Sequence, residues 1–168
     1  MTPEEQDSLV YQLENFRGNF TCVGRGKGIA VYVRQELCES EAYRYQELCK
    51  EHLQVGKISL NDVDIINVYR SQEEPFYTMA HYLSEMINLN KTSLIVGDFN
   101  YDAANEANEV SKYLSKQQFK QLVTSPTHLG GHILDQAHLR QSLRKKNAEV
   151  KTFTTYYSDH DIVTVILR

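Results

Sequence analysis

Hydrophobic and polar residues follow two different periods along this chain, and each period predicts a different kind of element. Thr2 is suited to cap a helix and Pro3 to its first turn. Apolar residues follow them at helical spacing, and the pattern predicts a helix that ends at Gly18. An amphipathic stripe predicts a second helix over 75–89, and a third helix is expected at about 105–122. The pattern therefore predicts helices at the start and in the middle of the chain.

Short runs rich in apolar and β-branched residues predict the strands. The clearest runs, 53–60 and 63–69, are separated by the turn pair Asn61-Asp62 and predict a β-hairpin. Further strands are predicted at 28–34, 93–97, 132–139, 150–155 and 162–167. Strands that are partly linked by hairpins and interleaved with helices are typical of a layered α/β or α+β domain. Because no repeat or linker interrupts residues 1–168, we expect a single domain.

The composition restricts the class of protein. A chain of 168 residues, 41% hydrophobic and 24% charged, is typical of one soluble globular domain. No apolar run approaches the roughly 18 residues that span a bilayer, so no membrane partner is expected. Cys22, Cys38 and Cys49 lack CxxC spacing and are expected to be reduced thiols. The polar segment after Met1 has no signal-peptide pattern, which predicts an intracellular location, with the nucleus as a candidate compartment.

The charge balance limits how the chain could bind nucleic acid. A net charge of −4 and a pI near 5.9 argue against a protein that coats nucleic acid without specificity, because such binding needs many basic groups. A phosphate-backbone partner would therefore be held locally, and the one clear basic cluster comprises Arg140, Arg144, Lys145 and Lys146. A solvated turn between two strands explains this cluster equally well.

Polar side chains stand beside three of the predicted strands. Asp98 and Asn100 follow the strand at 93–97, Asp135 lies in the strand at 132–139, and Asp159 and His160 precede the last strand. Hard oxygen ligands favour Mg²⁺ or Mn²⁺, and magnesium commonly takes further ligands from water and phosphate. The set predicts phosphate chemistry, with Asp135 orienting the imidazole of His160. A single Asp at a strand end is more often a cap or turn residue, so the prediction rests on the combination.

Three stretches resemble the C-terminal motifs of the endonuclease/exonuclease/phosphatase family. They are "IVGDFN" (95–100), "SPTHLGGHILDQAHL" (125–139) and "YSDHDIV" (157–163). The Thr-His-x-x-Gly…Leu-Asp form of the middle motif is similar to the mobile-element branch, as is "GKGIAVYVR" (26–34). "INVYRS" (66–71) resembles the strand that ends in a substrate-side tyrosine, without the usual proline. The resemblance implies a DNase I-like β-sandwich of two mixed sheets flanked by helices.

The family resemblance also implies roles for individual residues. Asp98 would position or deprotonate the attacking water, and Asn100 would contact the scissile phosphate. Asp159, together with Asp98, would bind a magnesium or manganese ion. His160 would contact the phosphate or the metal side of the site, with Asp135 as its partner. The implied activity is that of a Mg²⁺-dependent DNA endonuclease from a mobile element.

Substrate contacts are implied for a second set of residues. Tyr69 would help to hold the phosphate, and Arg140 and Arg144 belong to a basic loop that favours DNA over a small phosphoester. His128 lies in the Thr-His stretch near the nucleic-acid side, where a hydrogen bond that stabilises the loop is an equally good explanation. Two alternatives stay open, because a fold does not settle the substrate. They are a phosphatase on a small phosphoester and an inactive module that binds nucleic acid or protein.

The chain departs from the family pattern at its N-terminus. Family members begin with two strands and a helix, and the strands end in a metal-site asparagine and a metal-binding glutamate that have no match here. Glu4 and Glu5 fall in the first turn of the predicted helix, so neither is assigned as the ligand. We therefore expect a domain that is incomplete at its N-terminus and impaired or inactive alone. Exposed sheet edges should then invite self-association or pairing with another chain.

Overall fold

The computed structural model describes residues 13–24, 27–105, 108–142 and 147–168 of the chain. Within them the elements are β1 (Phe16–Gly24), β2 (Lys27–Arg34), α2 (Gln35–Cys38), β3 (Arg44–Lys50), β4 (Leu53–Ser59), β5 (Val63–Arg70), α3 (Phe76–Met86), β6 (Thr92–Asp98), α4 (Glu109–Lys116), β7 (Lys120–Gln121), β8 (Asp135–Arg140), β9 (Ala148–Phe153) and β10 (Ile162–Leu167). No helix among the described residues is long and apolar enough to cross a membrane. Cys38 and Cys49 carry thiols, as expected.

The strands form one large sheet and two ribbons. The large sheet has six strands in the order β3-β4-β5-β6-β8-β7, and its β5–β6 pair is parallel while the other pairs are antiparallel. The ribbons are the antiparallel pairs β1–β2 and β9–β10. The predicted α/β class is confirmed, but the described strands form one mixed sheet and two ribbons rather than two mixed sheets.

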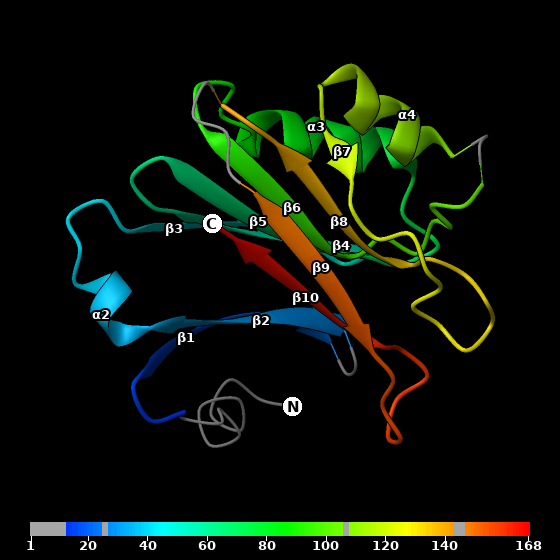
Figure 1. Cartoon of the computed structure of the whole chain (residues 1–168), viewed down its shortest axis with the longest axis horizontal. Helices are drawn as coiled ribbons and strands as arrows, with labels where there is room; N and C mark the ends of the chain where they lie inside the picture. The colour runs from blue at the N-terminus through cyan, green and yellow to red at the C-terminus, as the bar shows by residue number, and fades with distance from the viewer. Residues whose placement is uncertain (1–12, 25–26, 106–107, 143–146) are drawn as a thin grey trace.

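One face of the six-stranded sheet is covered by α3 and α4 (Figure 1). Alternate residues of β5, among them Ile66 and Val68, point to this face and are 0% and 1% exposed. They form the main core with the fully buried helix residues Met79, Leu83 and Leu114. Because the alternation along β5 has the period of a strand, the sequence pattern and the observed burial agree.

The two ribbons lie over the opposite face of the same sheet (Figure 1). Val33 of β2 packs with Tyr43 and Ile58 in one cluster. Val163 and Val165 of β10 pack in another cluster, which contains Val123, Ile133 and Ala137. The molecule is therefore a sandwich, with helices outside one layer and ribbons as the second layer.

Two of the predicted helices differ from the structure. The helix expected from residue 2 lies mostly outside the described residues, and its predicted end is wrong because Phe16 begins β1. The helix expected over 105–122 is shorter: the Asn108 side chain accepts hydrogen bonds from Val110 N and Ser111 N and caps α4 at its start. Gln118 then takes a left-handed conformation (φ 65°), and the chain leaves the helix to form β7.

The other predicted elements are present with small shifts at their ends. The hairpin at 53–60 and 63–69 is confirmed as β4 and β5. The helix at 75–89 is α3, which ends earlier because Ile87 is extended (φ −75°, ψ 122°). The strands predicted at 28–34, 93–97, 150–155 and 162–167 are β2, β6, β9 and β10. The strand predicted at 132–139 begins later, at Asp135.

Candidate active site

Three polar side chains line up across the centre of the six-stranded sheet. The strand register pairs Tyr69 with Asp98, and Asp98 with Asp135. Directly paired residues point to the same face, so these side chains form one row across β5, β6 and β8. All three are half-buried. Since Val68 faces the helices, Tyr69 and its row lie on the ribbon face. We call these three residues the polar row.

The end of β6 is shaped by a glycine that no other residue could replace without strain. Gly97 has φ 140°, and a Cβ atom at this position would lie 1.9 Å from the carbonyl oxygen of Val68. The backbone of β5 therefore occupies the space that a side chain at position 97 would need, just before Asp98. Phe99 then inserts its fully buried ring into the helix-side core. Its anchoring fixes the direction in which Asp98 leaves the strand.

Asn100 holds the Asp98 carboxylate in place. Its backbone N–H donates to Asp98 Oδ1 (2.9 Å), and its Nδ2 donates to Asp98 Oδ2 (3.2 Å) and to the carbonyl oxygen of Arg70 (2.8 Å). Asn100 itself is left-handed (φ 48°), a conformation that Asn tolerates better than most residues. Because both amide protons of Asn100 are already donated, the predicted direct contact with phosphate would leave only Oδ1, which cannot donate. The observed role is to position Asp98.

The surroundings of Asp98 raise its pKa, which suits a general base. Burial raises the pKa of this carboxyl, the hydrogen bond from Asn100 N–H lowers it, and the nearby Asp135 raises it; the result lies above the ordinary value of 3.8. A carboxylate with a raised pKa accepts a proton more readily than an exposed one. Asp98 therefore has the chemistry predicted for the group that activates water.

His160 is bound to Asp135 by the shortest side-chain contact of the site. Its Nδ1 lies 2.7 Å from Asp135 Oδ2. Burial alone would lower the pKa of His160, but the hydrogen bond and charge of Asp135 and the charges of Asp98 and Asp159 raise it above 6.5. Because Nδ1–H donates to Asp135, Nε2 is the ring nitrogen left for other chemistry. The structure thus assembles the His160–Asp135 pair beside Asp98.

His128 and Asp159 flank this pair. His128 and His160 form a β-bridge, and their ring centroids are 4.9 Å apart. His128 Nδ1 accepts from Gly130 N (2.9 Å), so the neutral ring carries its proton on Nε2, which lies 3.4 Å from Asp159 Oδ2. The Asp159 carboxylate accepts hydrogen bonds from its own backbone N–H and from His128, and these lower its pKa although desolvation raises it. This geometry matches the loop-stabilising explanation for His128.

Thr127 is a buried residue of the site that the sequence did not single out. Its Oγ1 accepts from Leu134 N (3.1 Å) and Asp135 N (2.9 Å), and its carbonyl oxygen accepts from Asp161 N (2.7 Å). The side chain is fully buried. Thr127 therefore ties the start of β8, which carries Asp135, to the segment that carries His160. It stands inside the Thr-His stretch, but only the tertiary contacts reveal its function.

Arg70 is a second residue that the sequence did not single out. Its Nη1 donates to Phe99 O (3.1 Å) and its Nη2 to Gln72 O (3.3 Å). Its guanidinium lies 3.8 Å from the ring centroid of Tyr101. The residue is 3% exposed, and burial lowers its pKa although nearby groups, Tyr101 first, raise it. Arg70 fastens the turn after β6 to the end of β5.

Arg140, a predicted DNA-binding residue, does not lie at the polar row. Asp135 and Arg140 are the first and last residues of β8, and at about 3.4 Å per residue they are about 17 Å apart. Arg140 Nη1 donates instead to Leu89 O (2.8 Å). Its place at the far end of β8 separates Arg140 from the polar row, and its contact with DNA stays a prediction. Arg144 lies outside the described residues.

The described residues do not by themselves form a magnesium site. Among them, one group of His, Cys, Asp or Glu side chains brings its ligand atoms within 4.8 Å of one another: His128, Asp159 and His160. Two of its three donors are imidazoles, whereas magnesium prefers oxygen ligands. Asp98, the other predicted ligand, is not in that group. The magnesium ion therefore stays a prediction from the family resemblance.

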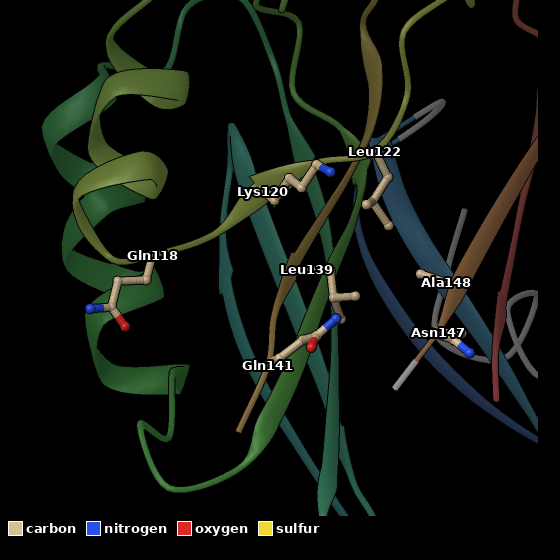
Figure 2. A pocket seen from close by; sticks show the side chains of 7 residues that line it. All are labelled: Gln118, Lys120, Leu122, Leu139, Gln141, Asn147 and Ala148. Carbon is tan, nitrogen blue, oxygen red and sulfur yellow. The ribbon is translucent and has the colours of Figure 1, made fainter. Parts of the chain in front are cut away.

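A surface groove lies away from the polar row, beside β7 and the start of β9 (Figure 2). This groove has a volume of about 390 Å³ and is lined by Gln118, Lys120, Leu122, Leu139, Gln141, Asn147 and Ala148. Lys120 is its one charged side chain, and no carboxylate or imidazole lines it. Within the described part of the chain, the groups suited to hydrolysis are therefore gathered at the polar row and not here.

Comparisons with known proteins agree with this architecture. No family model matches the sequence, and no curated protein matches it. The endonuclease domain of TRAS1, a telomere-specific non-LTR retrotransposon, is similar in structure, with a TM-score of 0.64 at 13% identity over 93% of this chain and 80% of that one. CdtB, the biologically active subunit of cytolethal distending toxin, gives 0.59 at 15% identity over 89% of this chain and 66% of that one.

A third solved structure leads to the same assignment. An endonuclease/exonuclease/phosphatase family protein from Leptotrichia buccalis C-1013-b gives a TM-score of 0.52 at 14% identity, over 91% of this chain and 71% of that one. At these identities the likeness concerns the fold and not the activity. The chain has the DNase I-like fold of the endonuclease/exonuclease/phosphatase proteins.

Proposed function

We propose that this chain is a phosphodiester-hydrolysing domain of the mobile-element endonuclease type, with DNA as its substrate. The observation that carries the proposal is the arrangement of Asp98, at the end of β6, beside the His160–Asp135 pair. The fold supports it, because solved structures with this fold include an endonuclease domain of a retrotransposon. The three sequence motifs that resemble the endonuclease/exonuclease/phosphatase family supply these same residues, and the middle motif is similar to the mobile-element branch.

Each side chain has a defined part in the proposed reaction. Asp98 accepts a proton from water as the water oxygen forms a bond to phosphorus, and its raised pKa suits this transfer. Protonated His160 donates a hydrogen bond from Nε2 to the oxygen on which negative charge develops. The bond from phosphorus to the leaving oxygen breaks with its electron pair, and that oxygen takes a proton from solvent. Asp135 holds the imidazole and favours its protonated form.

Substrate charge makes a cation necessary in this proposal. A phosphodiester that reaches the polar row meets the carboxylates of Asp98 and Asp135, and like charges repel. The family resemblance predicts Mg²⁺ or Mn²⁺ as the compensating cation. Since the described residues do not form its site alone, the ion would need ligands from the substrate, from water or from other residues.

Binding without hydrolysis is the second candidate. The observation that favours it is the nitrogen-rich composition of the group formed by His128, Asp159 and His160. A domain that lacks firm magnesium ligands could still hold a phosphate through the protonated imidazole of His160. The same assay separates the two candidates, because one produces cut DNA and the other only retained DNA.

The test is plasmid nicking. The purified chain is incubated with supercoiled plasmid and Mg²⁺ or Mn²⁺, beside the variants His160→Ala and His81→Ala. His81 is a matched control, because it also pairs with a carboxylate, Glu85 at 3.2 Å, but lies on α3 at the helix side. We expect slow nicking by the wild type and His81→Ala, in line with the impaired activity expected from the sequence, and a further loss of about 10²–10⁴-fold in His160→Ala.

Three other results would overturn the proposal. Equal nicking by wild type and His160→Ala would exclude a role for the imidazole. Retention of DNA in a gel without nicking would support the binding module instead. Release of phosphate from a small phosphoester without action on DNA would support a phosphatase.

A further inference from the structure

The second layer of the sandwich is built from two separate ribbons. β2 lies against β4 and β5, and Ile29 of β2 approaches Gly56 of β4. β1 lies farther out, against β3. On the other side, β10 lies against β8, while Ala148 of β9 borders the outer groove with Lys120. The order across this layer is therefore β1, β2, β10, β9, so β2 and β10 are the inner strands.

A cavity lies under the inner edge of β10. It has a volume of about 430 Å³, and its apolar lining consists of Ile65 of β5, Leu94 and Val96 of β6, and Val163 and Val165 of β10. These residues alternate along their strands, so they all point into the space between the layers. A closed sandwich fills that space with side chains from both layers. Here the centre of the second layer leaves it open.

The backbone beside this cavity is suited to pairing with another strand. Among the described strands, β10 pairs only with β9, so the N–H and C=O groups on its other side point along the second layer toward β2 and have no partner strand there. A row of such groups on an edge strand is a template for an added strand. The side chains of a strand added there would point alternately into the cavity and away from it. The geometry therefore favours an extended segment over a helix or a small molecule.

The charge at one end of the cavity specifies the occupant further. Asp135 and Asp161 line that end together with Asn67 and Gln136, and no basic side chain is among the lining residues. His160 already pairs with Asp135, so a basic residue of an occupant at this end would mainly offset the charge of Asp161. We propose that the cavity is a docking site for a β-strand of another polypeptide segment, with alternating apolar side chains and a basic residue at the Asp135 end. This inference does not depend on the proposed hydrolysis.

The docked strand would end beside the polar row. Asp135 belongs to both the cavity lining and the row, and Asp161 follows His160 directly. Filling the cavity would also bury Val96 and Val163, which are half-buried. The added strand would thus stabilise the second layer and place its terminal residues next to the candidate active site. The sequence predicted that exposed edges would invite pairing, and the structure assigns this property to β10.

The test uses a short synthetic peptide in which valine and threonine alternate and a lysine stands at one end. Its matched control has the same sequence with alternate amides N-methylated, which removes backbone donors and keeps the side chains. We measure amide hydrogen exchange in β10 of the full chain by NMR. At a peptide concentration about ten times the dissociation constant, we expect exchange at the inner edge of β10 to slow about tenfold, and no change with the control.

Two variants of β10 sharpen the result. Val163→Glu places a charge on the cavity wall and should abolish the protection. Ile162→Glu changes the neighbouring residue, which is 49% exposed and lies outside the cavity lining, and should leave the protection intact. If Val163→Glu fails to fold, the N-methylated peptide still tests the wild-type chain. Equal protection by both peptides, or no protection at saturation, would overturn the proposal. Protection that rises with protein concentration alone would also overturn it, because a second copy would then be the occupant.

Discussion

The two faces of the six-stranded sheet differ in packing and in chemistry. On the helix face, Ile66 and Leu83 are 0% exposed and belong to one continuous core. On the ribbon face, Ile65 and Val96 are half-buried and border an open cavity of about 430 Å³. The polar row lies on this second face, at the end of the same strands. The comparison indicates that the helix face supplies most of the close packing, while the ribbon face carries the polar residues of the candidate site.

The largest difference between the faces should appear in unfolding experiments. Leu83→Ala empties part of the closed core and should lower the free energy of unfolding by about 2–5 kcal/mol. Ile65→Ala on the ribbon face enlarges a cavity that already exists, so it should cost about 1–2 kcal/mol. Urea denaturation of both variants gives the two values. An equal loss would contradict the distinction between the faces.

Two histidines should give the two faces opposite responses to pH. His138 lies on the helix face, where its Nε2 is 2.8 Å from Gln136 Oε1, and burial lowers its pKa to about 4. The unfolded chain, with a histidine pKa of 6.5, then binds the extra proton first. Stability should therefore fall as pH falls from 6.5 toward about 4, by roughly 3 kcal/mol over the full shift.

His160 on the ribbon face should act in the opposite direction. Its pKa is raised in the folded state, so its pairing with Asp135 stabilises the fold fully below pH 6.5 and is lost as pH rises through the raised value. Thermal melting of wild type, His138→Gln and His160→Gln across this range measures both effects. His138→Gln should be less sensitive to acid than wild type, and His160→Gln should differ from wild type mainly at low pH. Parallel curves for all three proteins would refute both assignments.

Gly97 lies directly before Asp98, and its Cα is close to the backbone of Val68 in the neighbouring strand β5. Gly97→Ala would force a Cβ atom against Val68 O in a backbone conformation that only glycine adopts easily. We expect a loss of about 1–3 kcal/mol in unfolding free energy, with displacement of the neighbouring Asp98. Urea denaturation measures the first effect, and NMR shifts of the Asp98 carboxyl carbon measure the second. Wild-type values for both would show that the close approach is not required.

The smallest expected effect concerns the support of the polar row. Thr127→Val keeps the shape of the side chain but leaves Leu134 N and Asp135 N without their acceptor, at a cost of about 1–3 kcal/mol. Thr127→Ser keeps the hydroxyl and is the matched control. NMR titration of His160 should give a lower pKa in Thr127→Val, because Asp135 is less firmly placed. Unchanged titration in both variants would limit Thr127 to a structural role.

The sequence predicted the elements with a strong hydrophobic period and missed those without one. The β4–β5 hairpin and α3 were predicted because buried residues recur at strand or helix spacing. β3 was missed because its residues, Arg44–Lys50, are mostly polar and exposed, as is usual at a sheet edge. The helix expected to end at Gly18 was wrong where β1 begins, since pairing with β2 decides the conformation there.

The sequence predicted those residues of the candidate site that lie at the ends of predicted strands. Asp98 and Asp135 could be placed together from the motifs, and the register brings them into one row. The functions of Thr127 and Arg70 could not be predicted, because both side chains bind backbone groups that are distant along the chain. The distance of Arg140 from the polar row could not be predicted either, because charge clustering carries no information on which end of β8 a residue occupies.

The central claim is that the Asp98 end of the ribbon face is a hydrolytic site, and one substitution tests it most directly. Asp98→Asn keeps the shape of the side chain and removes the base. With supercoiled plasmid and Mg²⁺ or Mn²⁺, the account predicts that Asp98→Asn nicks about 10²–10⁴-fold more slowly than wild type, while thermal melting confirms that it is folded. Nicking by Asp98→Asn at the wild-type rate would contradict the account.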